Sequence, residues 1–132
     1  MSLCLATSAV ALALAAPVFT LSWIHSVEKV EWRERWQVLP SGLAFIEGRM
    51  RGSGAGMDPP DGAALQDGWW VYRQTLQVPV LRLAVSGATG SGWQLCTDDT
   101  GCRDLEAWLA RDGQAPDAIE IRPGPDCARL PR

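Results

Sequence analysis

The chain has 132 residues, of which 47% are hydrophobic and 20% charged, and its formal net charge is -3. Because this length suffices for one hydrophobic core but not for two, we expect a single domain over residues 1–132. The mild acidity and the scattered arginines argue against a nucleic-acid partner, which needs a concentrated basic surface.

No charged side chain precedes Glu28, and three interpretations of this first part of the chain are open. Leucine and alanine alternate over residues 9–15, which is the period of a strand, and residues 2–6 would form a strand before it. Alternatively, residues 1–15 are a secretory leader cut near Ala15, although the basic region of such leaders is missing. A membrane anchor is the third interpretation, but the run contains Pro17 and no flanking lysine or arginine.

The middle of the chain alternates between apolar and polar residues. Phe19, Leu21 and Trp23 predict a half-buried strand that reaches His25, the only histidine. A second alternation over residues 30–38 places the tryptophans on one face and the charged residues, except Glu34, on the other. A turn over residues 39–43 separates it from a strand over residues 43–51.

The second half begins with a long loop rich in glycine and proline over residues 52–68. Strands follow over residues 69–78 and 80–86, then a hairpin of residues 93–96 and 102–105, and a last strand over 118–124. The chain is therefore expected to be mainly β: an antiparallel β-sandwich or barrel of about eight strands, with one short helix near 104–112.

Four cysteines are present, and two of them flank a run of turn-forming residues. Cys96 and Cys102 would face each other across this turn if the register allows, so a disulfide between them is one of two open outcomes. It would indicate an oxidising compartment. Cys4 and Cys127 make no second closely spaced pair, so we expect no zinc site, no other metal site and no cofactor.

His25, Ser26 and Glu28 form the first candidate site. Adjacent residues of a strand point to opposite faces, so His25 cannot easily act as the base for Ser26. We therefore expect His25 and Glu28 to brace a corner between strands or to bind a ligand or partner, and we expect no enzymatic activity.

Glu34 lies between two tryptophans on the apolar face of its predicted strand. A carboxylate buried there must be paired or protonated, because desolvating an unpaired charge is costly. Arg49 and Arg51 of the next strand are the predicted partners of Glu34.

The loop after Arg51 contains Ser53, Gly54 and Gly56, whose backbone amides could hold an anion. The spacing matches neither the dinucleotide fingerprint nor the phosphate-binding loop. Trp69 and Trp70 occupy opposite faces of one strand, so one of them can enter the core while the other meets a partner.

Five stretches carry a resemblance to known sequences: "FTLSWIHSVEKVEWRERW", "GLAFIE", "RGSGAGMDPPDGA", "DGWWVYR" and "LRLAVSGATGSGWQLC". Together they resemble an uncharacterised family of small bacterial domains found beside the genes of TAXI-type TRAP transporters. The resemblance implies a domain of unknown function, in the periplasm or another extracytoplasmic compartment. It also implies an accessory role with the permease or its substrate-binding protein as partner, near the membrane through that partner. It brings no catalytic residues.

The expected function is thus that of a non-enzymatic accessory domain that binds a transporter component. One alternative is a β-barrel that binds a small organic anion, with Arg49 or Arg51 in a closed pocket. A serine hydrolase that uses Ser26 or Ser53 with His25 is the second alternative, and it needs a serine oxygen within about 3 Å of the histidine.

Overall fold

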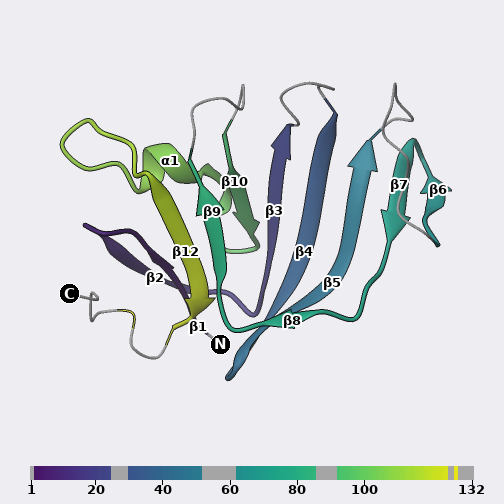
Figure 1. Cartoon of the computed structure of the whole chain (residues 1–132), viewed down its shortest axis with the longest axis horizontal. Coiled ribbons are helices and arrows are strands. Elements are labelled where there is room, and N and C mark those ends of the chain that lie inside the picture. Colours follow the sequence, from purple (N-terminus) through teal and green to yellow (C-terminus); the bar gives the residue numbers. More distant parts are fainter. Residues whose placement is uncertain (1, 25–29, 52–61, 86–91, 125–126, 128–132) are drawn as a thin grey trace.

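The computed structural model describes residues 2–24, 30–51, 62–85, 92–124 and Cys127. Its strands form two antiparallel sheets that face each other, with one short helix beside them (Figure 1). The described strands do not close into a barrel, so of the two expected architectures the sandwich is confirmed.

The smaller sheet contains the first and the last of the described strands. Its order is β2-β1-β12-β9, and its strands span Ser2–Ala6 (β1), Ala11–Ala15 (β2), Leu81–Ala84 (β9) and Ala118–Pro123 (β12). The alternation of leucine and alanine near the N-terminus therefore forms a hairpin, in which Leu3 faces Leu14 and Leu5 faces Leu12.

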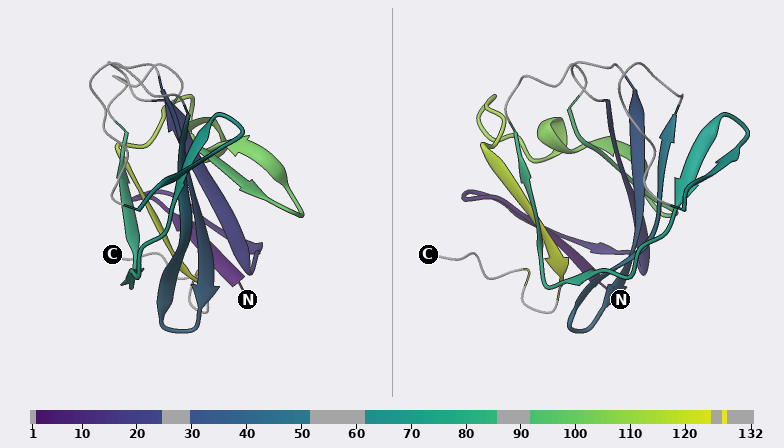
Figure 2. Two further views of the ribbon diagram at one scale, coloured as in Figure 1. Left: turned by 90° about the vertical axis from the view of Figure 1, so that its right-hand side faces the viewer. Right: turned by 45° about the vertical axis from the view of Figure 1, so that its right-hand side comes forward.

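The larger sheet has the order β11-β10-β3-β4-β5-β7-β6, and β8 adds to one end of β5. Its strands are Val18–Ile24 (β3), Glu31–Leu39 (β4), Gly42–Arg51 (β5), Ala64–Gln66 (β6), Trp69–Tyr72 (β7), Gln77–Val78 (β8), Gln94–Thr97 (β10) and Gly101–Asp104 (β11). The views in Figure 2 show this sheet facing β12 and β9 across the core.

The core lies between the inner faces of the two sheets. Every second residue of each central strand points inward, which is why these sequences alternate. The large sheet contributes Phe19, Leu21, Trp36, Val38, Leu43 and Leu95, and the small sheet contributes Leu3, Leu5, Leu83, Ile119 and Ile121.

The helix α1 is shorter than the expected segment 104–112 and spans Leu105–Trp108. The Asp104 carboxylate caps it by accepting hydrogen bonds from the backbone N–H groups of Glu106 and Ala107. Beyond Leu109 the chain turns, because Asp112 and Gly113 both adopt a positive φ and Arg111 pairs with Gln114.

Two expectations about the strands were wrong. The segment expected to be a single strand over 69–78 is divided into β7, which pairs with the end of β5, and β8, which pairs with its beginning. The expected loop over 52–68 contains β6, which pairs with β7. The described strands consequently outnumber the expected eight.

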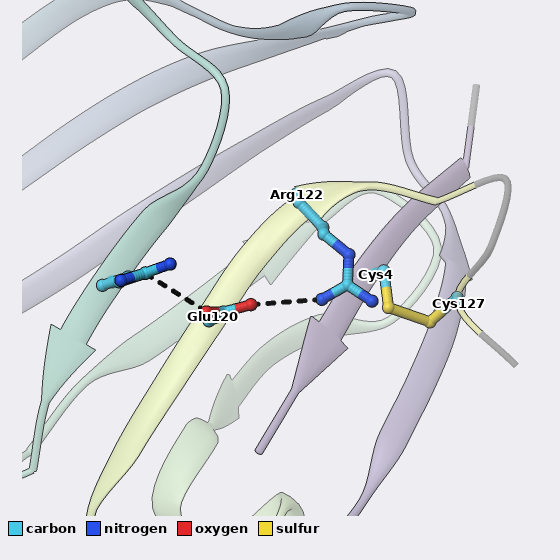
Figure 3. Close-up of polar contacts among 5 residues, drawn as sticks. Cys4, Glu120, Arg122 and Cys127 are labelled. Atoms are coloured by element: carbon cyan, nitrogen blue, oxygen red, sulfur yellow. Dashed lines mark hydrogen bonds and ion pairs between the residues drawn. A yellow bond between two sulfur atoms is a disulfide. The ribbon is translucent and has the colours of Figure 1, made fainter. Parts of the chain in front are cut away.

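Two disulfides are present. Cys96 and Cys102 face each other in the β10/β11 hairpin, with their Cα atoms 4.0 Å apart, and a disulfide joins them. Of the two outcomes left open by the sequence, the structure has the cross-linked one. The second joins Cys4 to Cys127 over a sequence separation of 123, and it was not predicted. Figure 3 shows it on the small sheet beside Arg122.

Candidate binding surfaces of the large sheet

The alternation of β4 and β5 separates Glu34 from its predicted partners. Glu34 faces Gly48 in the register, on the inner face with Trp32 and Trp36. Arg49 directly follows Gly48 in β5 and therefore points to the outer face, as does Arg51. The expected ion pair between Glu34 and these arginines was wrong, because their side chains lie on opposite sides of the sheet.

The outer face of the large sheet carries a group of arginines from three neighbouring segments, which we call the arginine face. Strand β4 contributes two of them, β5 two, and the end of β7 one. Its members are Arg33, Arg35, Arg49, Arg51 and Arg73.

Some of these charges are compensated by carboxylates on the same face. Arg33 Nε lies 2.8 Å from Glu31 Oε2, and Arg49 Nε lies 2.7 Å from Glu47 Oε2. Arg73 approaches the same Glu47 at 3.5 Å. Among the described residues no carboxylate lies in ion-pair contact with Arg35, which is exposed.

The register also brings like charges together. Arg33 and Arg49 are directly opposite each other on β4 and β5, an arrangement that destabilises an antiparallel pair unless something offsets it. A concavity of about 370 Å³ lies here, partly open to solvent, and Arg35, Glu47 and Asp98 also line it. Three arginines against two acidic residues leave this hollow with an excess of positive charge, which suits a carboxylate or another anion.

Trp69 and Trp70 lie on opposite faces, as predicted. Trp69 is on the outer face, where the guanidinium groups of Arg33 and Arg51 stack over its ring at 4.6 and 5.1 Å from the ring centre. These contacts leave Trp69 only 8% exposed. They hold the two arginines in place beside the concavity.

The inner face contains a partly buried carboxylate, that of Glu34, next to the only tyrosine of the sequence. Glu34 is surrounded by Trp36, whose Nε1–H donates to Glu34 Oε1 at 3.2 Å, and by Tyr72. Burial raises the pKa of Glu34, while the hydrogen bond from Trp36 lowers it by a smaller amount. Burial, and secondly the charge of Glu34, raise the pKa of Tyr72 to about 12.

This coupling gives a titration that can be measured directly. The chain has one tyrosine, so the absorbance of tyrosinate reports Tyr72 alone. We expect ionisation near pH 12 in the folded protein and near 10.0 after unfolding. Because the unfolded tyrosine loses its proton first, stability should fall as the pH rises from 10 towards 12.

The substitution Glu34→Gln removes the negative charge beside Tyr72 and should therefore lower the pKa of Tyr72 in the folded protein. Glu31→Gln, on the outer face of the same strand, is the matched control and should leave that pKa unchanged. An equal effect of both substitutions would contradict the placement of Glu34 beside Tyr72.

Five candidate residues lie outside the described residues. They are His25, Glu28, Ser53, Gly54 and Gly56, and the same holds for Ser26. Their predicted roles as a brace, a binding group or a nucleophile stay predictions. Among the described residues, no group of three or more histidine, cysteine, aspartate or glutamate side chains is placed to hold a metal ion.

The outer face of the small sheet carries a second polar cluster, shown in Figure 3. Glu120 forms ion pairs with Arg82, at 3.2 Å, and with Arg122, at 3.3 Å. Because the carboxylate is shared by two arginines of this sheet, the cluster braces β9 against β12. A hollow of about 690 Å³ beside it is bordered by the β1/β2 turn.

Part of the arginine face was not predicted from the sequence. Arg49 and Arg51 were predicted as binding residues, whereas Arg33 and Arg35 were expected only as the polar side of a strand. The signal was present in the alternation, since "WRERW" and "GRMR" place arginines at every second residue of strands predicted to be neighbours.

Comparison with known proteins identifies one similarity. Residues 19–105 match the family model described as "Domain of unknown function (DUF1850)". The matched segment runs from β3 to the first residue of α1, and so contains the arginine face. No curated protein and no solved structure matches the chain significantly. No helix among the described residues is long and apolar enough to cross a membrane.

Proposed function

The chain belongs to the DUF1850 family, and from this starting point we propose that it is a non-enzymatic interaction domain. In this proposal it acts outside the cytoplasm as an accessory of a TAXI-type TRAP transporter. The arginine face binds an acidic surface or segment of the permease or of its substrate-binding protein.

The pairing of Arg33 with Arg49 across β4 and β5 is the observation that carries the proposal. Directly opposed like charges cost stability. Glu31 and Glu47 offset part of this cost, and a bound carboxylate would offset more of it. Arg35, beside them in the same concavity, supplies a cation without an ion-pair partner among the described carboxylates. The formal net charge of the chain is -3, so this arginine-rich surface contrasts with the rest of the molecule and can orient an acidic partner.

The compartment is supported by the two disulfides. Such cross-links persist in oxidising environments and are rare in the cytosol. The transporter as partner is supported by the resemblance of the motifs over residues 19–96 to domains encoded beside such transporters.

The test is capture of purified permease and substrate-binding protein by the immobilised domain. We expect the double substitution Arg35→Glu/Arg49→Glu to weaken capture by at least about tenfold, because each reversal replaces an attraction by a repulsion. Capture by the unaltered domain should also weaken as salt is added.

The matched control is Arg82→Glu, which reverses a charge on the small sheet and should leave capture unchanged. If the unaltered domain captures neither transporter component, the proposed partner is refuted. Equal capture by both variants would refute the arginine face as the binding surface.

Binding of a small organic anion is the second candidate, and the volume of the concavity favours it. About 370 Å³ is within the range of small-ligand sites. Such sites enclose most of their ligand, whereas this concavity is partly open, which is why we favour a protein partner. Thermal stabilisation by a dicarboxylate, lost in Arg35→Glu/Arg49→Glu, together with no capture of transporter components, would reverse this order.

A further inference from the structure

Among the described residues the two sheets have five edge strands, and four of them carry features that prevent pairing with another strand. These edges are β2 and β9 of the small sheet, and β6, β8 and β11 of the large sheet. Charges, prolines and short length are the usual means by which proteins protect an edge. Strand β9 contains Arg82, β11 contains Arg103 and Asp104, β6 has only three residues, and β8 has only two.

Strand β2 lacks all of these features. It is five residues long, has the sequence ALALA, and carries neither a charge nor a proline. Among the described strands it pairs only with β1. Ala13 and Ala15 are exposed, and Leu12 and Leu14 are only partly exposed.

The hydrogen-bond pattern of the hairpin shows which backbone groups of β2 face outward. Thr7 N donates to Val10 O at 2.8 Å, so these residues form a hydrogen-bonded pair at the turn. Bonded and non-bonded pairs alternate in an antiparallel ladder. Leu12 and Leu14 therefore bond to β1, and the N–H and C=O groups of Ala11, Ala13 and Ala15 point to the free edge.

The sequence of β2 reads the same in both directions. In an antiparallel pair centred on Ala13, Ala11 faces Ala15, Leu12 faces Leu14, and Ala13 faces its own counterpart. Such self-complementarity is what a two-fold symmetric contact between identical chains requires. We infer that β2 binds β2 of a second copy of this chain, which joins the two small sheets into one continuous sheet.

This pairing would satisfy the outward-facing backbone groups of β2 and would also bury its apolar side chains. Each outward-facing alanine exchanges both of its backbone hydrogen bonds with its counterpart across the symmetry axis. On the inner face, Leu12 and Leu14 of the two copies meet and remove their remaining apolar surface from water. On the outer face this strand carries only alanines, whose side chains are small.

Introducing a charge at Ala13 in the full chain tests the inference. Because Ala13 faces itself, Ala13→Lys and Ala13→Glu each place two like charges opposite each other. Each variant should self-associate about fivefold more weakly than the unaltered chain. An equimolar mixture of the two variants should recover the dimer, since opposite charges then face each other.

The association is measured by sedimentation velocity over a range of protein concentrations. Ala84→Lys is the matched control, since Ala84 is an exposed alanine on β9, the other edge of the same sheet. It should dimerise like the unaltered chain. The inference is overturned if the unaltered chain stays monomeric at all concentrations, if Ala13→Lys dimerises as strongly as Ala84→Lys, or if the mixture fails to recover the dimer.

Discussion

Replacing both Cys4 and Cys127 by alanine is expected to lower the free energy of unfolding by about 5 kcal/mol on a chain-entropy basis. The disulfide closes a loop over a sequence separation of 123, which is nearly the whole chain. It restricts the unfolded state accordingly, and it attaches β1 to the end of the chain that follows β12. Both cysteines are buried, with exposed fractions of 0% and 3%.

The other disulfide provides the matched control. Cys96 and Cys102 are only six positions apart, so Cys96→Ala/Cys102→Ala should cost about 2 kcal/mol on the same basis. Both values follow from the midpoints of urea unfolding and the slopes of the transitions. If the two double substitutions cost the same, loop length does not determine the contribution of these cross-links.

Much of the fold could be predicted because its strands alternate strictly. The strands around Leu21, Trp36 and Leu5 each place every second residue in a core between two sheets, and that period is visible in the sequence. The hairpin with Cys96 and Cys102 was predictable for the same reason, since a short run of turn residues fixes which positions face each other.

The remaining features depend on contacts between distant segments. The partner of Cys4 could not be predicted, because nothing local to either cysteine indicates that β1 and β12 are neighbours. The division of residues 69–78 into two strands follows from the way β5 extends past β7, and β6 forms only because β7 offers a free edge. Such tertiary effects override local propensity.

For the candidate site, the alternation within each strand indicates which residues share a face but not which residues of two strands are opposite each other. The sequence indicated Arg49 and Arg51 as candidate binding residues, and Trp69 and Trp70 as candidate partner contacts; of these, Arg49, Arg51 and Trp69 lie on one face. The predicted pairing of the arginines with Glu34 was wrong, because it depends on the register between β4 and β5, which the sequence of neither strand specifies. Glu34 faces Gly48, so its neighbours are those of Gly48 and not of Arg49.

Gly48 itself is the position at which a small substitution should have a large effect. It lies on β5 between Glu34 on one side and Tyr72 on the other. A Cβ atom at this position would collide with the ring of Tyr72, whose Cζ, Oη and Cε2 atoms lie over the glycine. Tyr72 is 7% exposed and stacks on Phe45, with ring centres 6.0 Å apart.

Gly48→Ala is therefore expected to lower the free energy of unfolding by about 3 kcal/mol, at the upper end of the usual cost of overpacking. The ring cannot move aside freely, because Phe45 contacts Trp36 of the main core at a centre-to-centre distance of 5.2 Å. Unfolding by urea gives the cost, and the titration of Tyr72 shows whether the ring has shifted relative to Glu34.

A double-mutant cycle separates this collision from the general effect of a larger residue in a strand. Tyr72→Leu removes the ring, so Gly48→Ala should cost much less in that background than in the unaltered chain, with a coupling of about 2 kcal/mol. Gly42→Ala does not serve as a control, because its Cβ would meet the backbone of Val78 at 2.5 Å. Additive costs of Gly48→Ala and Tyr72→Leu would contradict the packing of Tyr72 over Gly48, and with it the position of the phenol beside the Glu34 carboxylate.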